Sequence, residues 1–540
     1  MRYFDDWEFS GQAPPGKKPD LYHSKVEIRD GWGNLIGEVG DYESLHLAFN
    51  AEAADVEASS MTLPGSSFWS TTFMRANRQI LLVHVLIYRD DKMVKMWTGR
   101  VDRSVRSMEG KQGKINVELI SDKAWLNFIM AWSAPFGPLW LQIPKKQVKV
   151  GKAVGVMKQF LIDNLLRLQN RFEVLNPVLA TVSTYQEIPL LWKTVQEYMW
   201  PLIVVPTPLL TDTSPIVALT VQMTPMSEVW HEVCKDYNLL PVIKYHVPGR
   251  DDPPPSITMT RPGLVFDIQD KDKARVQGDL KILGEIVKEA GIFIRGLFGR
   301  YDAPPVLDTK NVDQLRSYFG NQAGDSWTIF RTSDEHWFSY EVASYPPTAS
   351  TSIAGGKSQD FLNEAIQLVS NGVVRQAFAL IGVGFQGNFI SDELSDMLLA
   401  YQAAEDPEMR ENLGPFTFFE EYLGPGTTAY SFDSAQGLRL ARYNAIGYKT
   451  ATFNGGIGTA LPFRPFEDFD LLDPVAWEDP DEDRLVPERM KEITYGETRD
   501  EGVSWEFRIG QIERPEEPWA IQQRRNEMFK KAILTALLAD

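Results

Sequence analysis

Apolar and polar residues alternate along the first third of the chain, most regularly between Lys25 and Leu63. Val26 and Ile28 alternate with charged neighbours, which is the period of a strand with one buried face. Residues 30–34 (DGWGN) then predict a tight turn, because glycine and asparagine accept positive φ. Residues 45–49 alternate again. The whole stretch predicts a β-meander with no chemically reactive group in it.

Similar strand patterns recur along the rest of the chain, separated by turn residues. They cover residues 79–88, 93–101, 115–119, 241–247, 256–260, 264–268, 327–330, 337–342, 490–495 and 503–509, with shorter runs at 430–432, 438–443 and 446–453. Strands at this spacing indicate sandwich or barrel domains. The predicted fold class is therefore α+β and mostly β.

Helical spacing of apolar residues appears in fewer places. It predicts a short helix at 123–126, an amphipathic helix at about 151–171, a second at 192–199, two more between 358 and 401, and a last helix from Trp519 to Asp540. Thr224-Pro225 predicts the start of another helix, with Thr224 as the cap and proline in the first turn.

These elements predict a division of the chain into domains. The predicted units are an N-terminal arm (1–20), an N-terminal β-barrel domain (21–150), a helical insertion (151–200), an α/β domain (201–350) with an apolar insertion at about 277–300, a helical and apolar insertion (351–430), a C-terminal β domain (431–512) and a C-terminal helix (513–540). The arm either crosses a neighbouring subunit or is loose, and its composition fits both.

Composition narrows the class of protein. The length of 540 residues predicts three or four domains, and a hydrophobic content of 43% is ample for burial. The 15 Trp and 29 Phe favour large subunit contacts. A net charge of −18 argues against duplex binding but fits a wall past which DNA slides without adhering. A single cysteine rules out an internal disulfide framework, and the absence of a signal peptide or long apolar run predicts a soluble protein.

Two glycine-rich motifs resemble nucleotide-binding motifs, but the sequence around them does not fit a nucleotide-binding fold. Residues 382–387 match G-x-G-x-x-G, but no series of βαβ units surrounds them. Residues 355–358 (GGKS) end like a phosphate loop, yet Thr351 stands where that loop needs a glycine. Flexible turns are the better interpretation, and no cofactor is predicted.

Three further candidates suggest catalysis or metal binding. Cys234 with His231 and His246 could form a thiol centre, but Cys234 shares an apolar stripe with Trp230 and Tyr237, which predicts a buried structural cysteine. Glu420 and Glu421 could serve glycoside cleavage, which requires a fixed carboxyl separation that sequence spacing does not give. The tract 467–483 carries nine acids and no Lys or Arg, and predicts a solvated or ion-binding loop; if it binds an ion, Ca²⁺ is the one expected. No catalytic, cofactor or metal residue is predicted with a defined role.

Several blocks resemble the hub-type minor tail proteins of siphophages, in particular those infecting actinobacteria. The first block is D-x-x-G-N-x-I-G-E-V followed by D-Y-E-S-L and T-L-P (residues 30–64). A second block holds IAGGKS, F-L-N, D-E-L-S-D-M-L-L-A-Y-Q, G-P-F and F-E-E-Y (353–422), and a third covers 462–470, 489–495 and 502–510. The resemblance spans most of the chain in order.

This resemblance implies a structural protein rather than an enzyme. It implies a homotrimeric hub at the tip of a non-contractile tail, with tube-like β-barrel domains around a channel, similar to the baseplate hub of contractile phages. The implied partners are the distal tail protein ring, the tape measure protein and other minor tail or receptor-binding proteins, with passage of DNA and contact with the host envelope. Two alternatives stay open: a tail-associated cell-wall hydrolase using Glu420, Glu421 or Cys234, and a receptor- or glycan-binding tail protein.

Overall fold

The structure is a computed structural model in which most of the chain between residues 21 and 510 is described. The residues outside the description are 1–20, 53–56, 110–111, 136, 138, 144, 170–198, 208–211, 213, 256, 272–327, 333–336, 347–348, 358–400, 406–410, 412, 417, 429–447, 457–460, 482–483 and 511–540. The predicted helices at 192–199, 358–401 and 519–540, the short runs at 430–443 and the motif at 382–387 fall wholly or largely on them.

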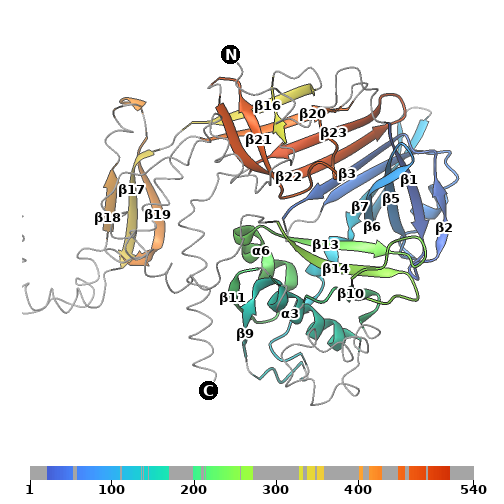
Figure 1. Cartoon of the computed structure of the whole chain (residues 1–540), viewed down its shortest axis with the longest axis horizontal. Coiled ribbons are helices and arrows are strands. Elements are labelled where there is room, and N and C mark those ends of the chain that lie inside the picture. Colours follow the sequence, from blue (N-terminus) through green and yellow to red (C-terminus); the bar gives the residue numbers. More distant parts are fainter. Residues whose placement is uncertain are drawn as a thin grey trace, which may run out of the picture.

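One large sheet joins the two ends of the described chain (Figure 1). Its order is β16-β20-β23-β22-β3-β4-β7-β6-β5-β1-β2, with β21 and β15 attached beside β22. The N-terminal strands are β1 (Tyr22–Arg29), β2 (Leu35–Val39), β3 (Ser44–Asn50), β4 (Ala58–Pro64), β5 (Leu82–Arg89), β6 (Lys92–Glu109) and β7 (Gln112–Ser121). The C-terminal strands are β15 (Ile329–Phe330), β16 (Trp337–Tyr345), β20 (Tyr448–Gly455), β21 (Pro474–Asp479), β22 (Arg484–Thr498) and β23 (Gly502–Ile509).

The turn between β1 and β2 forms where the sequence predicts it. The Asp30 carboxylate accepts hydrogen bonds from the backbone N–H of Trp32 (2.9 Å) and of Asn34 (2.8 Å), and Gly33 has φ 87°. Added side-chain atoms at Gly33 would also collide with the Tyr245 hydroxyl, which lies 2.5 Å from the position of a Cβ. Glycine is required here by both the backbone and the neighbouring unit.

The predicted simple meander is wrong in its pairing. β1 lies between β2 and β5, while β3 pairs with β4 on one side and with β22 on the other. Residue Phe49 of β3 therefore stands opposite Ile493, far along the chain. Alternation predicted each strand but not its partner, because the period of side chains carries no information about which edge a strand meets.

A second unit packs beside the large sheet, around two helices. It contains the three-stranded sheet β10-β14-β13 and the pairs β9–β11 and β8–β12. Its elements are η1 (Asp122–Asn127), β8 (Met130–Ala131), β9 (Gln147–Lys152), α3 (Ala153–Leu168), β10 (Leu202–Val204), β11 (Ile216–Val221), β12 (Thr224–Pro225), α6 (Met226–Tyr237), β13 (Leu239–His246) and β14 (Gly263–Asp270). A short helix, α2 (Ser70–Met74), lies between β4 and β5.

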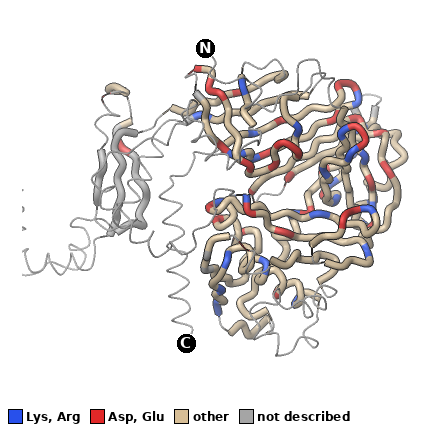
Figure 2. Tube along the Cα trace, viewed as in Figure 1, with Lys and Arg blue, Asp and Glu red and all other residues tan. Residues whose placement is uncertain are grey.

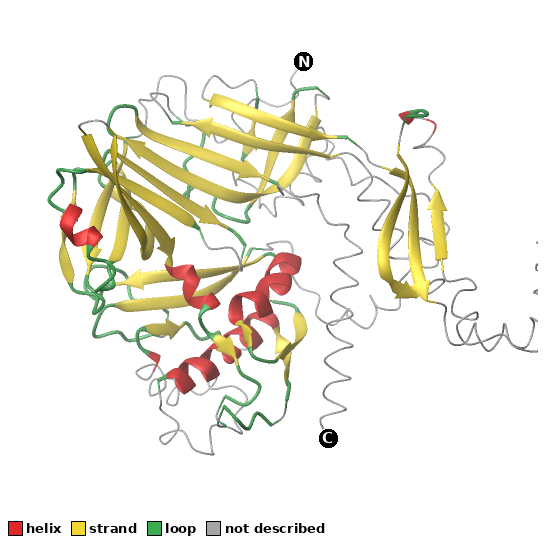
Figure 3. Cartoon of the chain, turned by 180° about the vertical axis from the view of Figure 1, so that it is seen from behind, coloured by secondary structure: helices red, strands yellow, loops and turns green. Residues whose placement is uncertain are grey.

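The sequence predicted both helices of this unit. Two other predictions for it, a strand at 256–260 and a helix cap at Thr224, are wrong. α3 and α6 share one hydrophobic core with β10, β13 and β14. Figure 3 shows the helices of this unit beside its strands, seen from behind. Residues 257–260 form no strand; they belong to the connection between β13 and β14. Thr224 does not cap α6, because its hydroxyl donates to the carbonyl of Gln222 (3.1 Å).

A third, small sheet has the order β18-β17-β19 and is drawn apart from the other two units (Figure 1). Its strands are β17 (Ala349–Lys357), β18 (Tyr401–Glu405) and β19 (Phe418–Thr428). The fold class, α+β and mostly β, is confirmed. The domain division stays a proposal; α3, from the predicted insertion 151–200, and α6, from the predicted domain 201–350, contribute to the same core.

Candidate functional site

The acidic tract 467–483 is not one solvated loop, although Asp468 and Asp481 are exposed. Residues 474–479 form β21, and the side chain of Asp479 is fully buried against the Lys449 ammonium at 2.9 Å. Glu467 pairs with Arg89 and, at 2.7 Å, with Lys92. Among the described residues no cluster of three or more His, Cys, Asp or Glu could hold a metal. The tract supplies counter-charges for lysines and arginines of other strands.

The centre of this arrangement is a charged junction, which we define as Lys95, Lys271, Asp470 and Asp473. Lys95 projects from β6, Lys271 follows β14, and the two aspartates precede β21. The Lys95 ammonium lies 3.2 Å from the Asp470 carboxylate, and the Lys271 ammonium lies 3.2 Å from Asp473 and 3.9 Å from Asp470. The charged junction therefore ties the N-terminal strands, the C-terminal strands and the second unit together.

The electrostatics of the junction centre on the pair Asp470 and Lys95. Burial by itself would raise the pKa of Asp470, but the lysines Lys95 and Lys271 outweigh it and hold this pKa below its usual value. Burial lowers the pKa of Lys95, and Asp470 opposes that shift. The Lys95 ammonium also lies 4.2 Å from the centre of the Phe466 ring, a favourable cation–π distance.

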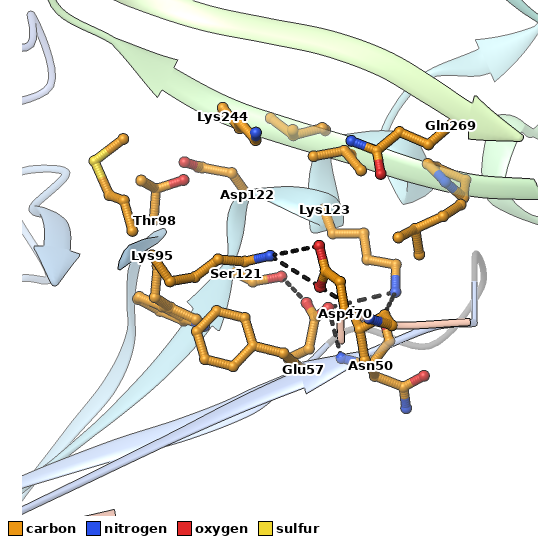
Figure 4. A pocket seen from close by; sticks show the side chains of 18 residues that line it. Asn50, Glu57, Lys95, Thr98, Ser121, Asp122, Lys123, Lys244, Gln269 and Asp470 are labelled. Atoms are coloured by element: carbon orange, nitrogen blue, oxygen red, sulfur yellow. Dashed lines mark hydrogen bonds and ion pairs between the residues drawn. The ribbon is translucent and has the colours of Figure 1, made fainter. Parts of the chain in front are cut away.

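A small cavity of about 100 Å³ lies beside the charged junction (Figure 4). A second ion pair borders it: the Lys123 ammonium donates to the Asn50 carbonyl (2.9 Å) and to Glu57 (3.4 Å), while the Ser121 hydroxyl also donates to Glu57. A larger cavity of about 470 Å³ adjoins it along β6 and β13. Lys95, Lys244 and Gln269 line both cavities together with the apolar residues Met96 and Val242, so the seam between the large sheet and the second unit mixes polar and apolar side chains.

A further contact fixes this seam at its other end. Arg250, in the β13–β14 connection, lies 3.4 Å from Glu27 of β1, and Glu27 also pairs with Arg29 at 2.7 Å. The Tyr245 hydroxyl donates to the Gly33 carbonyl (3.3 Å), and the ring of Tyr245 packs on the fully buried His84 at a centroid distance of 4.1 Å. Burial, with help from nearby arginines, lowers the pKa of His84 to about 3. The imidazole is therefore neutral at ordinary pH.

The thiol centre of Cys234, His231 and His246, which the sequence did not favour, is not assembled. Cys234 is buried in the core of the second unit, as predicted, and burial raises the pKa of its thiol. A nucleophilic cysteine needs the opposite shift. His231 lies on the same helix and His246 at the end of β13, where it borders the larger cavity.

We expect Cys234 to resist thiol reagents in the folded protein. Burial both blocks access and keeps the thiol protonated, so labelling by a disulfide reagent should be at least about 100-fold slower in the native chain than in urea. The rate of release of the coloured thiolate measures this directly. Native labelling as fast as that of the unfolded chain would contradict the buried position.

The other predicted residues give no catalytic arrangement that the structure describes. Glu420 is exposed on β19, and the side chain of Glu421 lies outside the described residues. Residues 355–357 of the GGKS motif belong to β17, so they form a strand rather than a phosphate-binding loop. Among the described helices, none has the length and apolar character needed to span a bilayer.

Sequence reasoning missed the charged junction, although one signal pointed toward it. Nine acids without a local cation either face water or find cations elsewhere in the fold, and Lys95 stands between the apolar residues Val94 and Met96 of a strand. A lysine in such a strand suggests a buried partner. The sequence does not show that Lys95 pairs with an acid of this tract.

A family model described as Siphovirus ReqiPepy6 Gp37-like protein matches residues 25–511. The minor tail protein Gp28 of Mycobacterium phage L5 is 25% identical over 236 residues, a match that covers 43% of this chain and 38% of that protein. The chain thus matches well under half the length of this relative.

Solved structures with some similarity include other tail proteins. The tail protein from Neisseria meningitidis MC58 aligns with a TM-score of 0.36 and 9% identity, over 91% of this chain and 97% of that one. The 43 kDa tail protein of prophage MuSo2 from Shewanella oneidensis aligns with a TM-score of 0.38 and 12% identity, over 91% and 98%. Both similarities are too weak to support an argument about function.

Proposed function

Because the chain belongs to the Siphovirus ReqiPepy6 Gp37-like family of tail proteins, we propose that it is a structural minor tail protein that forms a homotrimeric hub at the tip of a non-contractile tail. The observation that carries the proposal is the extent of the family match. Residues 25–511 include nearly all of the large sheet, from β1 to β23, and the whole second unit. The family relationship therefore applies to the complete described architecture rather than to one module.

The architecture suits a rigid building block. Strands from the two ends of the chain share one sheet, and the charged junction fastens the second unit to it. A force applied to the large sheet or to the second unit is therefore transmitted to the other through these contacts. A hub that holds its channel closed needs this kind of rigidity.

The large sheet also presents surfaces for contact with other subunits. Within the described residues, β2 and β16 each pair on one side only, and both expose apolar side chains: Leu35 and Ile36 on β2, Phe338 and Tyr340 on β16. Strand edges of this kind invite pairing with another chain. In the proposed hub they face neighbouring copies or the distal tail protein ring.

Charge supports the proposed passage of DNA. The chain carries a net charge of −18, and Figure 2 shows acidic positions on many of the strand ends and loops of the large sheet. Like charge keeps DNA from adhering to a channel wall. The wall of the proposed channel therefore repels DNA and does not bind it.

The proposal is tested by measuring the mass of the purified protein and by locating the protein in the virion. The purified full chain should show a species of three times its mass of 61.2 kDa by mass photometry, and gold-labelled antibody against it should mark the tail tip of intact virions. A chain that stays monomeric at micromolar concentration and in isolated tail tips, or label distributed along the tube, would overturn the hub assignment.

A further inference from the structure

An exposed apolar loop, residues 139–143 (LWLQI), lies in the second unit between β8 and β9. Trp140 is 81% exposed and Ile143 is 73% exposed, and Leu139 and Leu141 are also exposed. Phe128, just before β8, is exposed as well. Single exposed apolar residues are ordinary, whereas four in one five-residue loop indicate a contact surface.

Hydrogen bonds to neighbouring residues hold this loop so that its apolar side chains face outward. The Gln142 side chain accepts a hydrogen bond from the Ala134 N–H (3.0 Å) and donates one to the Ala134 carbonyl (3.2 Å). At the base of the loop, the Arg167 guanidinium lies 3.9 Å from the centre of the Trp132 ring. The backbone N–H of Trp132 donates a hydrogen bond to the Asn164 side chain of α3. The one polar side chain of the loop thus points back into the fold, while its apolar neighbours point outward.

The loop stands in a basic region of an otherwise acidic protein. Residues 128–169 contain five lysines and one arginine but a single acid, Asp163, which is buried and pairs with Lys149 at 2.6 Å. Lys158 is itself fully buried and pairs with Asp267 at 2.6 Å, so it adds no charge to this surface. Lys145 and Lys146, directly after the loop, are both exposed. Figure 2 shows the corresponding blue segments where Figure 1 places β9, at the end of the molecule away from β16 and β20.

We propose that this loop inserts into the interface of a phospholipid bilayer that contains anionic lipids. Tryptophan and apolar side chains enter the boundary between headgroups and acyl chains, while adjacent lysines meet the negative headgroups. A protein partner fits less well, because lysine is depleted from the cores of protein interfaces. The contact is superficial rather than spanning, and it does not depend on the hub assignment.

The test uses the full chain and vesicles of two compositions, pure phosphatidylcholine and phosphatidylcholine with phosphatidylglycerol. Binding is measured by co-sedimentation at low and high salt. Insertion is measured with an environment-sensitive fluorophore on a Leu141→Cys variant, which keeps Trp140 and Ile143 and is feasible because Leu141 is exposed and the native Cys234 is buried. The matched control is Trp32→Ala, since Trp32 is 79% exposed but lies in the β1–β2 turn beside Asp30.

Wild-type protein should bind the anionic vesicles more tightly than the neutral ones, and the fluorophore should shift to the blue on binding. Trp140→Ala with Ile143→Ala, and separately Lys145→Glu with Lys146→Glu, should each weaken binding by about tenfold or more, whereas Trp32→Ala should not. The proposal is overturned if wild-type protein ignores both vesicles, or if the loop variants bind as wild type does. A change of oligomeric state in the loop variants without vesicle binding would assign the loop to a protein contact instead.

Discussion

Replacing Phe330 with alanine should lower the free energy of unfolding by about 3–5 kcal/mol, the cost of removing a fully buried aromatic ring. Phe330 is completely buried, and its ring centre lies 5.3–5.7 Å from those of five other aromatic residues. These are Trp337, Phe453, Phe463, Phe469 and Phe507. They come from β16, β20, β23 and the loop before β21, so the single ring supports the whole C-terminal part of the large sheet.

Urea unfolding followed by tryptophan fluorescence measures this effect. The control is Phe416→Ala, because Phe416 is 99% exposed, lies outside the strands of the large sheet, and leaves no cavity when it is replaced. A midpoint for Phe330→Ala equal to that of Phe416→Ala would show that the aromatic cluster does not support the C-terminal strands. In the proposed hub, the Phe330 variant should also give fewer complete tail tips.

Replacing Asp470 with asparagine should destabilise the protein by about 2–3 kcal/mol near neutral pH, because it leaves the Lys95 ammonium without its anion. The side chains of Lys95 and Asp470 are 22% and 26% exposed, so the effect is smaller than for a fully buried pair. The double variant Lys95→Met with Asp470→Leu removes both charges together. It should recover most of the loss, since a well-packed apolar pair often replaces a buried ion pair without penalty.

The effect of Asp470 should depend on pH in a defined direction. Its folded-state pKa lies below the unfolded value of about 3.9, so its stabilisation is present above that value and is lost as the pH falls through the folded-state pKa. The difference between wild type and Asp470→Asn should therefore shrink in acid. Glu118→Gln, in the exposed pair with Arg103, serves as the control and should change stability little at any pH. A constant difference between wild type and Asp470→Asn down to strongly acidic pH would contradict an ionic role for Asp470.

Local patterns in the sequence determined most of the described elements. The turn at Asp30, the strands on either side of it and the helices α3 and α6 all appear at their predicted places, because alternation, turn residues and helical spacing act between neighbours. Burial of Cys234 followed from its place on the apolar stripe of α6. Motifs spread along the chain also gave the family of tail proteins, which the family match confirms.

The tertiary structure alone decided which distant segments meet. β3 pairs with β22, and the acids before β21 neutralise Lys92 and Lys95, which lie 375 residues earlier in the chain. An acidic tract has the same composition whether it faces water or buried lysines, so its sequence does not distinguish the two. The difference arises from the path of the chain, which is set by the sum of all packing contacts rather than by any local pattern.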